Sequence, residues 1–215
     1  MMNNLHPIRD YIVPGKRAHL VGIGGVSMCP LAEVLRGMGL HVQGSDMTES
    51  DTVRHLRSLG IPVAIGHNAE NLGDCDLVVR TAAVHDSNPE IAGAVARGIP
   101  VYERAQAWGA IMQRYPNALC VAGTHGKTTT TCLVRHILRQ TLGVRVGLIG
   151  TIRNLIDETE LETERTTPES CDVYRLLRQM ADAGCRYGVM EVSSHALALE
   201  RVWGCLLYTS DAADE

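Results

Sequence analysis

Phenylalanine is missing from the 215-residue sequence, and aromatic residues together make up only 4% of it. The sequence also lacks an apolar run near the roughly 18–20 residues that a membrane-spanning helix needs, and it begins without a signal-peptide core. Its charge is nearly balanced, with 20 Lys and Arg against 24 Asp and Glu, which excludes a broad nucleic-acid-binding face. We therefore expect a cytoplasmic protein with no membrane or nucleic-acid partner. Any anionic ligand must then be bound by local features of the fold.

Paired cysteines are lacking as well. The seven cysteines are scattered, with no CxxC pair and no zinc-ligand spacing. An odd number of thiols, several of them inside apolar segments, is typical of reduced core cysteines in the cytosol. The composition, 45% hydrophobic and 20% charged, excludes disorder, and the length suits one large domain or two modest ones.

From residue 18 onward the sequence contains strand-like apolar runs that alternate with helical patterns ending at glycines. This alternation predicts an α/β fold, with parallel sheets covered by helices on both faces. We expect a first domain at 1–106 with a Rossmann-like parallel sheet, whose strands lie at 19–23, 41–45, 61–65, 76–79 and 99–102. Helices are expected through Leu31–Leu35, over Asp51–Leu59, and after Asn88, an N-cap followed by Pro89 at the first helical position.

A second α/β cycle predicts a partial P-loop ATP-binding domain at 107–204. We expect its strands at 118–122, 144–149 and 187–192, and its helices at 105–114, 127–142 and 171–183. The stretch 205–215 fits neither pattern and resembles a translated sequencing-adapter read-through. We interpret it as a non-native tail whose removal leaves stability unchanged, and we expect the second domain to be incomplete.

The motif that indicates chemistry most strongly is Gly123–Thr130, Gly-Thr-His-Gly-Lys-Thr-Thr-Thr, between a predicted strand and a predicted helix. Glycines let backbone amides turn toward phosphate oxygens, and the helix start adds partial positive charge. Lys127 then reaches the β- and γ-phosphates, and the Thr128 hydroxyl reaches Mg²⁺. Only two residues separate the glycines, against four in the common P-loop. The alternative is an ordinary strand–helix turn.

A second glycine turn, Gly22-Ile-Gly24-Gly25, follows the first predicted strand. It begins like a dinucleotide fingerprint, but Ser27 stands where the third glycine belongs. Asp46 follows at the distance where an acid would meet a ribose. The alternative is a Rossmann-like turn that binds no ligand.

Polar residues also follow later strands. Glu191 lies at the end of a buried strand, where the carboxylate that binds a nucleotide's magnesium ion usually lies; the alternative is a salt-bridged glutamate. The polar stretch Arg165–Pro168 precedes a helix and is either a functional loop or a capping turn. We assign His195 no catalytic role.

Together these motifs resemble the Mur ligase family, which builds the peptide stem of peptidoglycan precursors. The Gly123–Thr130 loop is similar to the family's ATP loop. Residues 18–131 resemble the alanine-adding branch, in segments 22–28, 44–46, 81–84 and 88–90 and at His125. Residues 144–204 resemble instead the branch that adds lysine or diaminopimelate, in segments 147–151, 164–170 and 189–197. A natural fusion and a recombined gene would both produce this pattern.

The resemblance implies amide formation that uses ATP and Mg²⁺. The implied substrates are UDP-N-acetylmuramate or its dipeptide form, and an amino acid, with L-alanine favoured because the alanine-adding pattern spans more of the chain. Lys127 and Glu191 are the implied catalytic residues, and Thr128 and Glu191 the Mg²⁺ ligands. The implied ATP-binding residues are Gly123, Thr124, His125, Gly126, Lys127, Thr128 and Thr129. Those implied for the UDP substrate are Gly22, Gly24, Gly25, Asp46, Thr81, Thr166, Thr167, Ser193 and Arg201.

Some features of the family have no counterpart here. Leu199 stands where some members have glutamine, and the family's carboxyl-terminal domain and carbamylated lysine are not found. We therefore expect this chain to bind ligands without turnover. Two other interpretations stay open: a nicotinamide dehydrogenase, supported by the Gly22 turn alone, and a non-catalytic nucleotide-binding fragment.

Overall fold

The chain forms two compact units, Met1–Ile111 and Met112–Glu215. The computed structural model describes residues 7–123, 125–163, 165–203 and 205–209. The units divide inside helix α4 (Arg104–Met112), whereas the sequence pattern placed the domain boundary near residue 106. Within the described residues, no helix combines the length and apolar character needed to cross a membrane.

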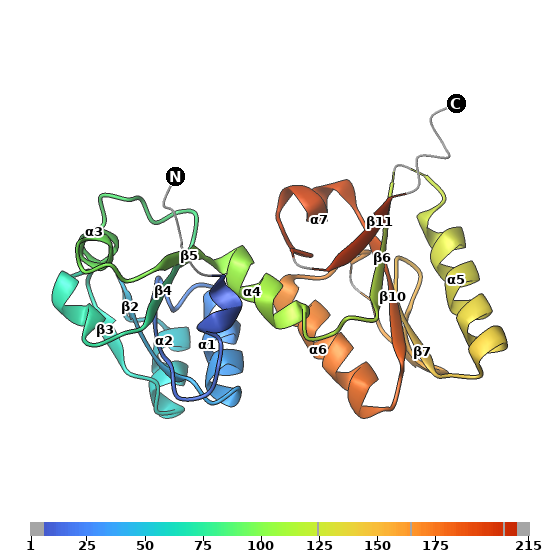
Figure 1. Cartoon of the computed structure of the whole chain (residues 1–215), viewed down its shortest axis with the longest axis horizontal. Helices are drawn as coiled ribbons and strands as arrows, with labels where there is room; N and C mark the ends of the chain where they lie inside the picture. Colours follow the sequence, from blue (N-terminus) through green and yellow to red (C-terminus); the bar gives the residue numbers. More distant parts are fainter. Residues whose placement is uncertain (1–6, 124, 164, 204, 210–215) are drawn as a thin grey trace. The chain divides into compact units, whose positions relative to one another are not determined.

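The first unit is an α/β fold around one parallel sheet (Figure 1). Its strands follow the spatial order β3-β2-β1-β4-β5, so the chain first builds outward on one side of β1 and then on the other. The crevice at the carboxyl ends of β1 and β4, where this order reverses, is where open α/β sheets bind ligands. In chain order the elements are η1 (Ile8–Asp10), β1 (Arg17–Val21), α1 (Met28–Gly37), β2 (His41–Asp46), α2 (Asp51–Ser58), β3 (Val63–Ile65), η2 (Ala69–Leu72), β4 (Leu77–Arg80), α3 (Pro89–Ala96) and β5 (Val101–Glu103).

Local capping fixes two helix starts in this unit. The Ser50 hydroxyl accepts the Val53 amide at the start of α2. The Asn88 side chain accepts the Glu90 amide at 2.9 Å, with Pro89 in the first turn of α3, as the sequence pattern predicts. Against one face of the sheet, α3 and η2 bury a cluster of apolar side chains: Val21, Leu72, Cys75, Val78, Ile91, Ala94 and Val101.

The second unit has a six-stranded mixed sheet in the order β11-β6-β10-β7-β8-β9. β11, β6, β10 and β7 are parallel, whereas β8 and β9 form an antiparallel hairpin at one edge. In chain order the elements after α4 are β6 (Ala118–Ala122), α5 (Lys127–Leu142), β7 (Val146–Ile149), β8 (Asn154–Ile156), β9 (Thr159–Leu161), α6 (Ser170–Asp182), β10 (Tyr187–Val192), α7 (Ser194–Ala198) and β11 (Leu206–Thr209).

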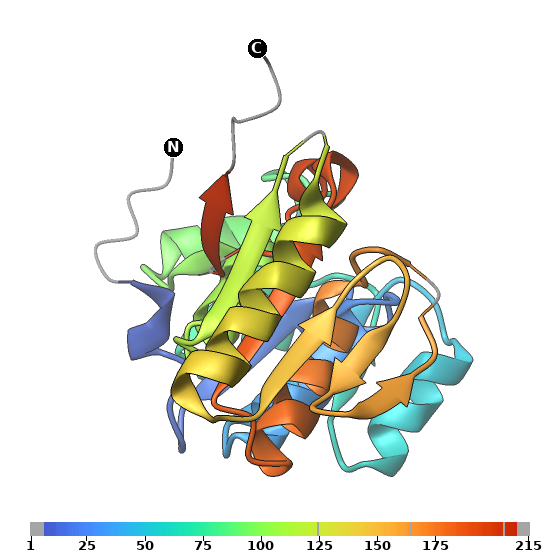
Figure 2. The same cartoon turned by 90° about the vertical axis from the view of Figure 1, so that its right-hand side faces the viewer.

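Helices cover both faces of this sheet, and α5 runs across one of them (Figure 2). Because side chains alternate along a strand, neighbouring residues serve opposite faces. Leu148 and Val189 pack with Val134 and Leu138 of α5. On the other face, the next residues along each strand, Ile149 and Met190, pack with the α6 side chains Val173, Leu177 and Met180. The fold class expected from the sequence is confirmed, and all seven cysteines are unbridged.

One expectation about the end of the chain is wrong. The sequence pattern predicted no element after residue 204, yet Leu206–Thr209 forms β11, parallel to β6 and paired with Leu119–Ala122. Two physical reasons apply: β6 would otherwise present an open edge, and Leu-Leu-Tyr-Thr consists of residue types that tolerate extended backbone. The six-stranded sheet includes this segment.

Candidate active site

The loop Gly123–Lys127 joins β6 to α5 and places the candidate phosphate-binding groups at the helix start. Gly126 has φ +74°, which favours glycine at that position, and Lys127 is the first residue of α5. The Lys127 ammonium donates to the Gly123 carbonyl at 2.8 Å, so it lies back across the loop. Thr124, which was also expected to bind ATP, lies outside the described residues.

Glu191 reaches this loop from the neighbouring strand β10. The register pairs Glu191 with Val121, so its side chain leaves the sheet just before the carboxyl end of β6. The residue is 1% exposed, and its Oε2 accepts the Thr128 hydroxyl at 2.9 Å. Two residues that the sequence assigned to one magnesium site are thus in direct contact.

Thr151 completes the environment of this carboxylate and was not among the residues singled out from the sequence. Its amide donates to Glu191 Oε1 at 3.1 Å and its hydroxyl to Oε2 at 2.9 Å. A sequence signal for it exists, because Thr151 lies two residues after the end of β7, a parallel neighbour of β10, and the carboxyl ends of such strands meet at one edge.

A cavity of about 450 Å³ opens between these elements. It gathers the loop, Glu191 and Ser193 from β10 and α7, and the hydroxyls of Thr151 and Thr166, which lie 3.1 Å apart. The lining residues are His125, Gly126, Lys127, Thr128, Thr129, Thr151, Thr166, Glu191 and Ser193. Of the described residues predicted to bind ATP, Mg²⁺ or the substrate in this unit, the cavity brings together all but Gly123, Thr167 and Arg201.

Thr167 and Arg201 are instead engaged inside the protein. Thr167 is 2% exposed; its hydroxyl donates to the Glu191 carbonyl and accepts the Ser193 amide, each at 3.0 Å. Arg201 forms a 2.6 Å ion pair with Glu169 and donates to the Thr167 carbonyl at 3.3 Å. These contacts fix the loop before α6 to the end of β10. The Ser193 hydroxyl likewise caps α7 by accepting the Ala196 amide.

The Glu191 carboxylate and the neighbouring Thr128 hydroxyl fit a magnesium ion as ligands. In the described part of the chain the carboxylate is buried and bonded only to neutral groups, two hydroxyls and one amide. A buried anion without a counter-charge is costly, and a cation would supply that charge. No group of three or more His, Cys, Asp or Glu gathers among the described residues. One carboxylate beside a threonine hydroxyl suits Mg²⁺, which keeps several waters and takes phosphate oxygens.

In the first unit, Gly22–Gly25 follows β1 at the edge where the strand order reverses. Gly22 has φ +78°, and the Gly24 amide donates to Asp46 Oδ2 at 2.9 Å. A Cβ on Gly24 would lie 2.9 Å from that oxygen, so glycine there permits the approach of the Asp46 carboxylate. Thr81 follows β4, whose last residue is in register with Val21 of β1. The structure therefore places these substrate-binding candidates of the first unit on one sheet edge.

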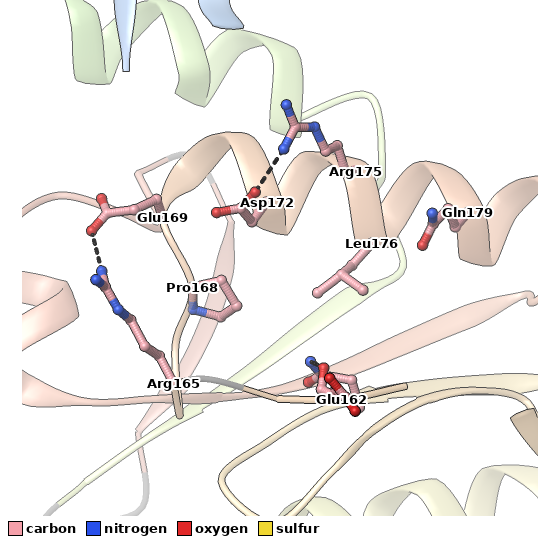
Figure 3. Close-up of a pocket in the computed structure, with 9 residues that line it drawn as sticks. Glu162, Arg165, Pro168, Glu169, Asp172, Arg175, Leu176 and Gln179 are labelled. Carbon is pink, nitrogen blue, oxygen red and sulfur yellow. Dashed lines mark hydrogen bonds and ion pairs between the residues drawn. The ribbon is translucent and has the colours of Figure 1, made fainter. Parts of the chain in front are cut away.

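A second cavity in the second unit, about 440 Å³, lies along α6 (Figure 3). Its arginines are neutralised by acids on the same stretch of chain: Arg165 pairs with Glu169 at 2.9 Å, and Arg175 with Asp172 at 3.0 Å. Glu169 also binds Arg201. These ion pairs leave the cavity without the uncompensated positive charge that would favour a phosphate group.

Comparisons with known proteins point to one family. Residues 17–116 match the model described as Mur ligase family, catalytic domain, and residues 121–212 match the Mur ligase middle domain. The second match extends into the stretch interpreted from the sequence as a tail.

Two similar curated proteins carry the same name. UDP-N-acetylmuramate--L-alanine ligase of Rhodospirillum rubrum is 54% identical over 120 residues, covering 56% of this chain and 25% of that protein. The enzyme of the same name from Acetivibrio thermocellus is 42% identical over 159 residues, covering 73% of this chain and 34% of that protein. The chain thus spans between a quarter and about a third of these relatives. A solved UDP-N-acetylmuramate-alanine ligase from Thermotoga maritima aligns over 91% of this chain and 53% of its own, with 25% identity and a TM-score of 0.48.

Proposed function

Because the chain belongs to the Mur ligase family, we propose that it carries the nucleotide-binding part of an ATP-dependent amide-forming ligase of peptidoglycan precursor synthesis. The proposed type is UDP-N-acetylmuramate–L-alanine ligase, the name of the similar curated proteins. The observation that carries the proposal is the buried Glu191 carboxylate bonded to Thr128 in the first turn of α5. Among the alternatives, a nicotinamide dehydrogenase would not require this second phosphate loop.

The proposed reaction joins a carboxylate to an amine through a phosphorylated intermediate. The substrate carboxylate attacks the γ-phosphate of ATP, which gives an acyl phosphate and ADP, and the amine of L-alanine then displaces phosphate. The protein contributes mainly positioning and charge neutralisation. The first amides of a helix have no partner within it, so those of Thr128 and Thr129 at the start of α5 would be available to phosphate oxygens.

Lys127 and Glu191 would have different electrostatic roles: Lys127 would bind phosphate oxygens, and Glu191 would bind the metal ion. The Lys127 ammonium would leave the Gly123 carbonyl for the β- and γ-phosphates, a better acceptor for a charged donor. Glu191 and Thr128 would hold Mg²⁺, which supplies charge neutralisation on the phosphates when bound. His125 and Thr129, which line the same cavity, complete the proposed ATP site.

For UDP-N-acetylmuramate we propose the glycine turn of the first unit. The Gly24 amide is occupied by Asp46, but among the described residues the amides of Val26 and Ser27 at the start of α1 have no acceptor. They are the groups that a diphosphate would meet there. Asp46 and Thr81 lie at the same sheet edge. We place the protein in the cytoplasm, where ATP is available.

The experiment that tests the proposal is ATP binding by titration calorimetry in the presence of Mg²⁺. Lys127 is one of only two lysines in the chain, so Lys16→Ala, in the first unit, is a matched control. We expect Lys127→Ala to weaken ATP binding by about a hundredfold, the size of two lost charge-assisted hydrogen bonds, and Lys16→Ala to leave it unchanged. If folded Lys127→Ala binds ATP as tightly as the parent, the ATP site is wrongly assigned.

A further inference from the structure

Thr151 contacts Glu191 through more groups than any other described residue. Its amide binds Oε1 at 3.1 Å and its hydroxyl binds Oε2 at 2.9 Å, so both carboxylate oxygens are held by one residue. The preceding residue, Gly150, makes this approach possible, because a Cβ there would lie 2.6 Å from Oε1. The loop after β7 is therefore shaped around the carboxylate.

The hydroxyls beyond Thr151 extend this contact to the loop before α6. Thr166 Oγ1 lies 3.1 Å from Thr151 Oγ1. A hydroxyl has one proton, and an ionised carboxylate can only accept. The Thr151 hydroxyl lies within donor distance of two acceptors, Glu191 Oε2 at 2.9 Å and Thr166 Oγ1 at 3.1 Å. Its single proton can serve only one of them at a time, so Thr166 competes with Glu191 for it.

We propose that Thr151 is a positioning residue for the metal site, and that it couples the Arg165–Pro168 loop to the Glu191 carboxylate. The terminal torsion of a glutamate is broad, so packing alone does not fix its oxygens. The two donors of Thr151 fix both, with Oε2 directed toward Thr128. The inference rests on the proposed function, because it gives Glu191 and Thr128 the task of holding a divalent cation.

The coupling has a consequence for ligand binding. A ligand group in the cavity that donates to the Thr166 hydroxyl oxygen occupies the acceptor that competes for the Thr151 proton. That proton is then directed to Glu191 Oε2. Occupancy of the Arg165–Pro168 loop and metal affinity should therefore depend on each other.

Mn²⁺ binding, measured by electron paramagnetic resonance on the whole chain with and without ATP, tests the positioning role. Thr151→Val preserves side-chain shape and removes the hydroxyl; Thr151→Ser keeps the hydroxyl. We expect Thr151→Val to weaken Mn²⁺ binding about tenfold, as expected for one hydrogen bond to a charged group, and Thr151→Ser to stay within about twofold. Thr159→Val, on the exposed strand β9, is the matched control with no expected change.

The coupling is tested by a double-mutant cycle. Thr166→Val removes the competing acceptor, so it should strengthen Mn²⁺ binding about threefold in the parent and have no effect when Thr151 is already valine. Equal effects in both backgrounds would overturn the coupling, and a folded Thr151→Val chain with parental Mn²⁺ affinity would overturn the positioning role. A parent that binds Mn²⁺ but not ATP would contradict the proposed function and leave this test in force. A parent that binds neither would overturn the inference.

Discussion

At the scale of single residues, Glu90 is a buried carboxylate that connects several elements of the first unit through hydrogen bonds. It is fully buried in the first turn of α3 and accepts the Ser45 hydroxyl at 2.5 Å and the Asn71 amide at 2.6 Å. The side chains of His19 and His67 lie 3.4 and 3.3 Å from Oε2. Burial alone would raise the pKa of Glu90, but the nearby His19 side chain and the hydrogen bonds from Ser45 and Asn71 outweigh it and lower the pKa to about 2.

This pKa gives a pH-dependent prediction. A carboxyl whose pKa falls from 4.5 to about 2 on folding stabilises the folded state above pH 4.5, and that stabilisation is lost as the pH falls toward 2. We expect Glu90→Gln to lower the free energy of unfolding of the first unit by on the order of 3 kcal/mol at neutral pH. The difference between parent and variant should shrink at about pH 3.

Urea denaturation at both pH values measures this effect. Glu70→Gln changes an exposed residue of the 3-10 helix η2 and is a matched control that should leave the free energy of unfolding unchanged at either pH. A parent–variant difference that stays constant between neutral and acid pH would contradict the role given to Glu90.

Single residues also show where sequence reasoning succeeds and fails. The contact between Thr128 and Glu191 follows from two motifs at the carboxyl ends of parallel strands, which the α/β alternation brings together. The internal bonds of Thr167 and Arg201 do not follow, because a side chain's partner depends on three-dimensional packing. Gly24 was implied as a residue for the UDP substrate, and the sequence does not reveal that its missing side chain makes room for the Asp46 carboxylate.

At the scale of elements, the long periodic segments were predictable and the short ones were not. The strand expected at 118–122 is β6, and the helix expected to run from the glycine loop to about Leu142 is α5 (Lys127–Leu142). The β8–β9 hairpin was not predicted, because its strands have only three residues each and its turn lacks glycine. Asp157 adopts the positive φ of this turn, +53°. Periodicity needs several residues to be visible, and a turn without Gly or Pro gives no local signal.

The edge strand β11 gives a prediction at this scale. The tail was expected to contribute nothing, but four residues pair with β6. Each ladder hydrogen bond contributes about 0.5–1.5 kcal/mol, partly offset by the entropy of ordering the segment, which leaves a net effect of about 1 kcal/mol. We expect a chain ending at Cys205 to melt about 5 °C below a chain ending at Thr209, the reference that keeps β11. Identical melting temperatures would show that this strand does not stabilise the sheet.

At the scale of the whole molecule, each unit has its own sheet and apolar core and its own glycine loop at a strand's carboxyl end. This organisation, which follows from two successive α/β cycles in the sequence, predicts that two chemically different ligands bind through separate segments. A net charge of −4 is compatible with two anionic ligands, because amides at a helix start and a lysine attract an anion locally, whatever the net charge of the chain.

Hydrogen exchange of the whole chain, measured with each ligand in turn, tests whether the two ligands bind through separate segments. Mg²⁺-ATP should slow exchange at 125–130 and around Thr151 and Glu191, because phosphate oxygens and the ion tie these segments together. UDP-N-acetylmuramate should slow exchange at 22–28 and leave the ATP loop unchanged. Its dipeptide form should protect the same segment, with added protection at 166–168 only if the peptide displaces the internal bonds of Thr167. Strong protection at 166–168 would favour the lysine- or diaminopimelate-adding reaction, and protection of 22–28 by NAD instead of the uridine ligand would favour a dehydrogenase.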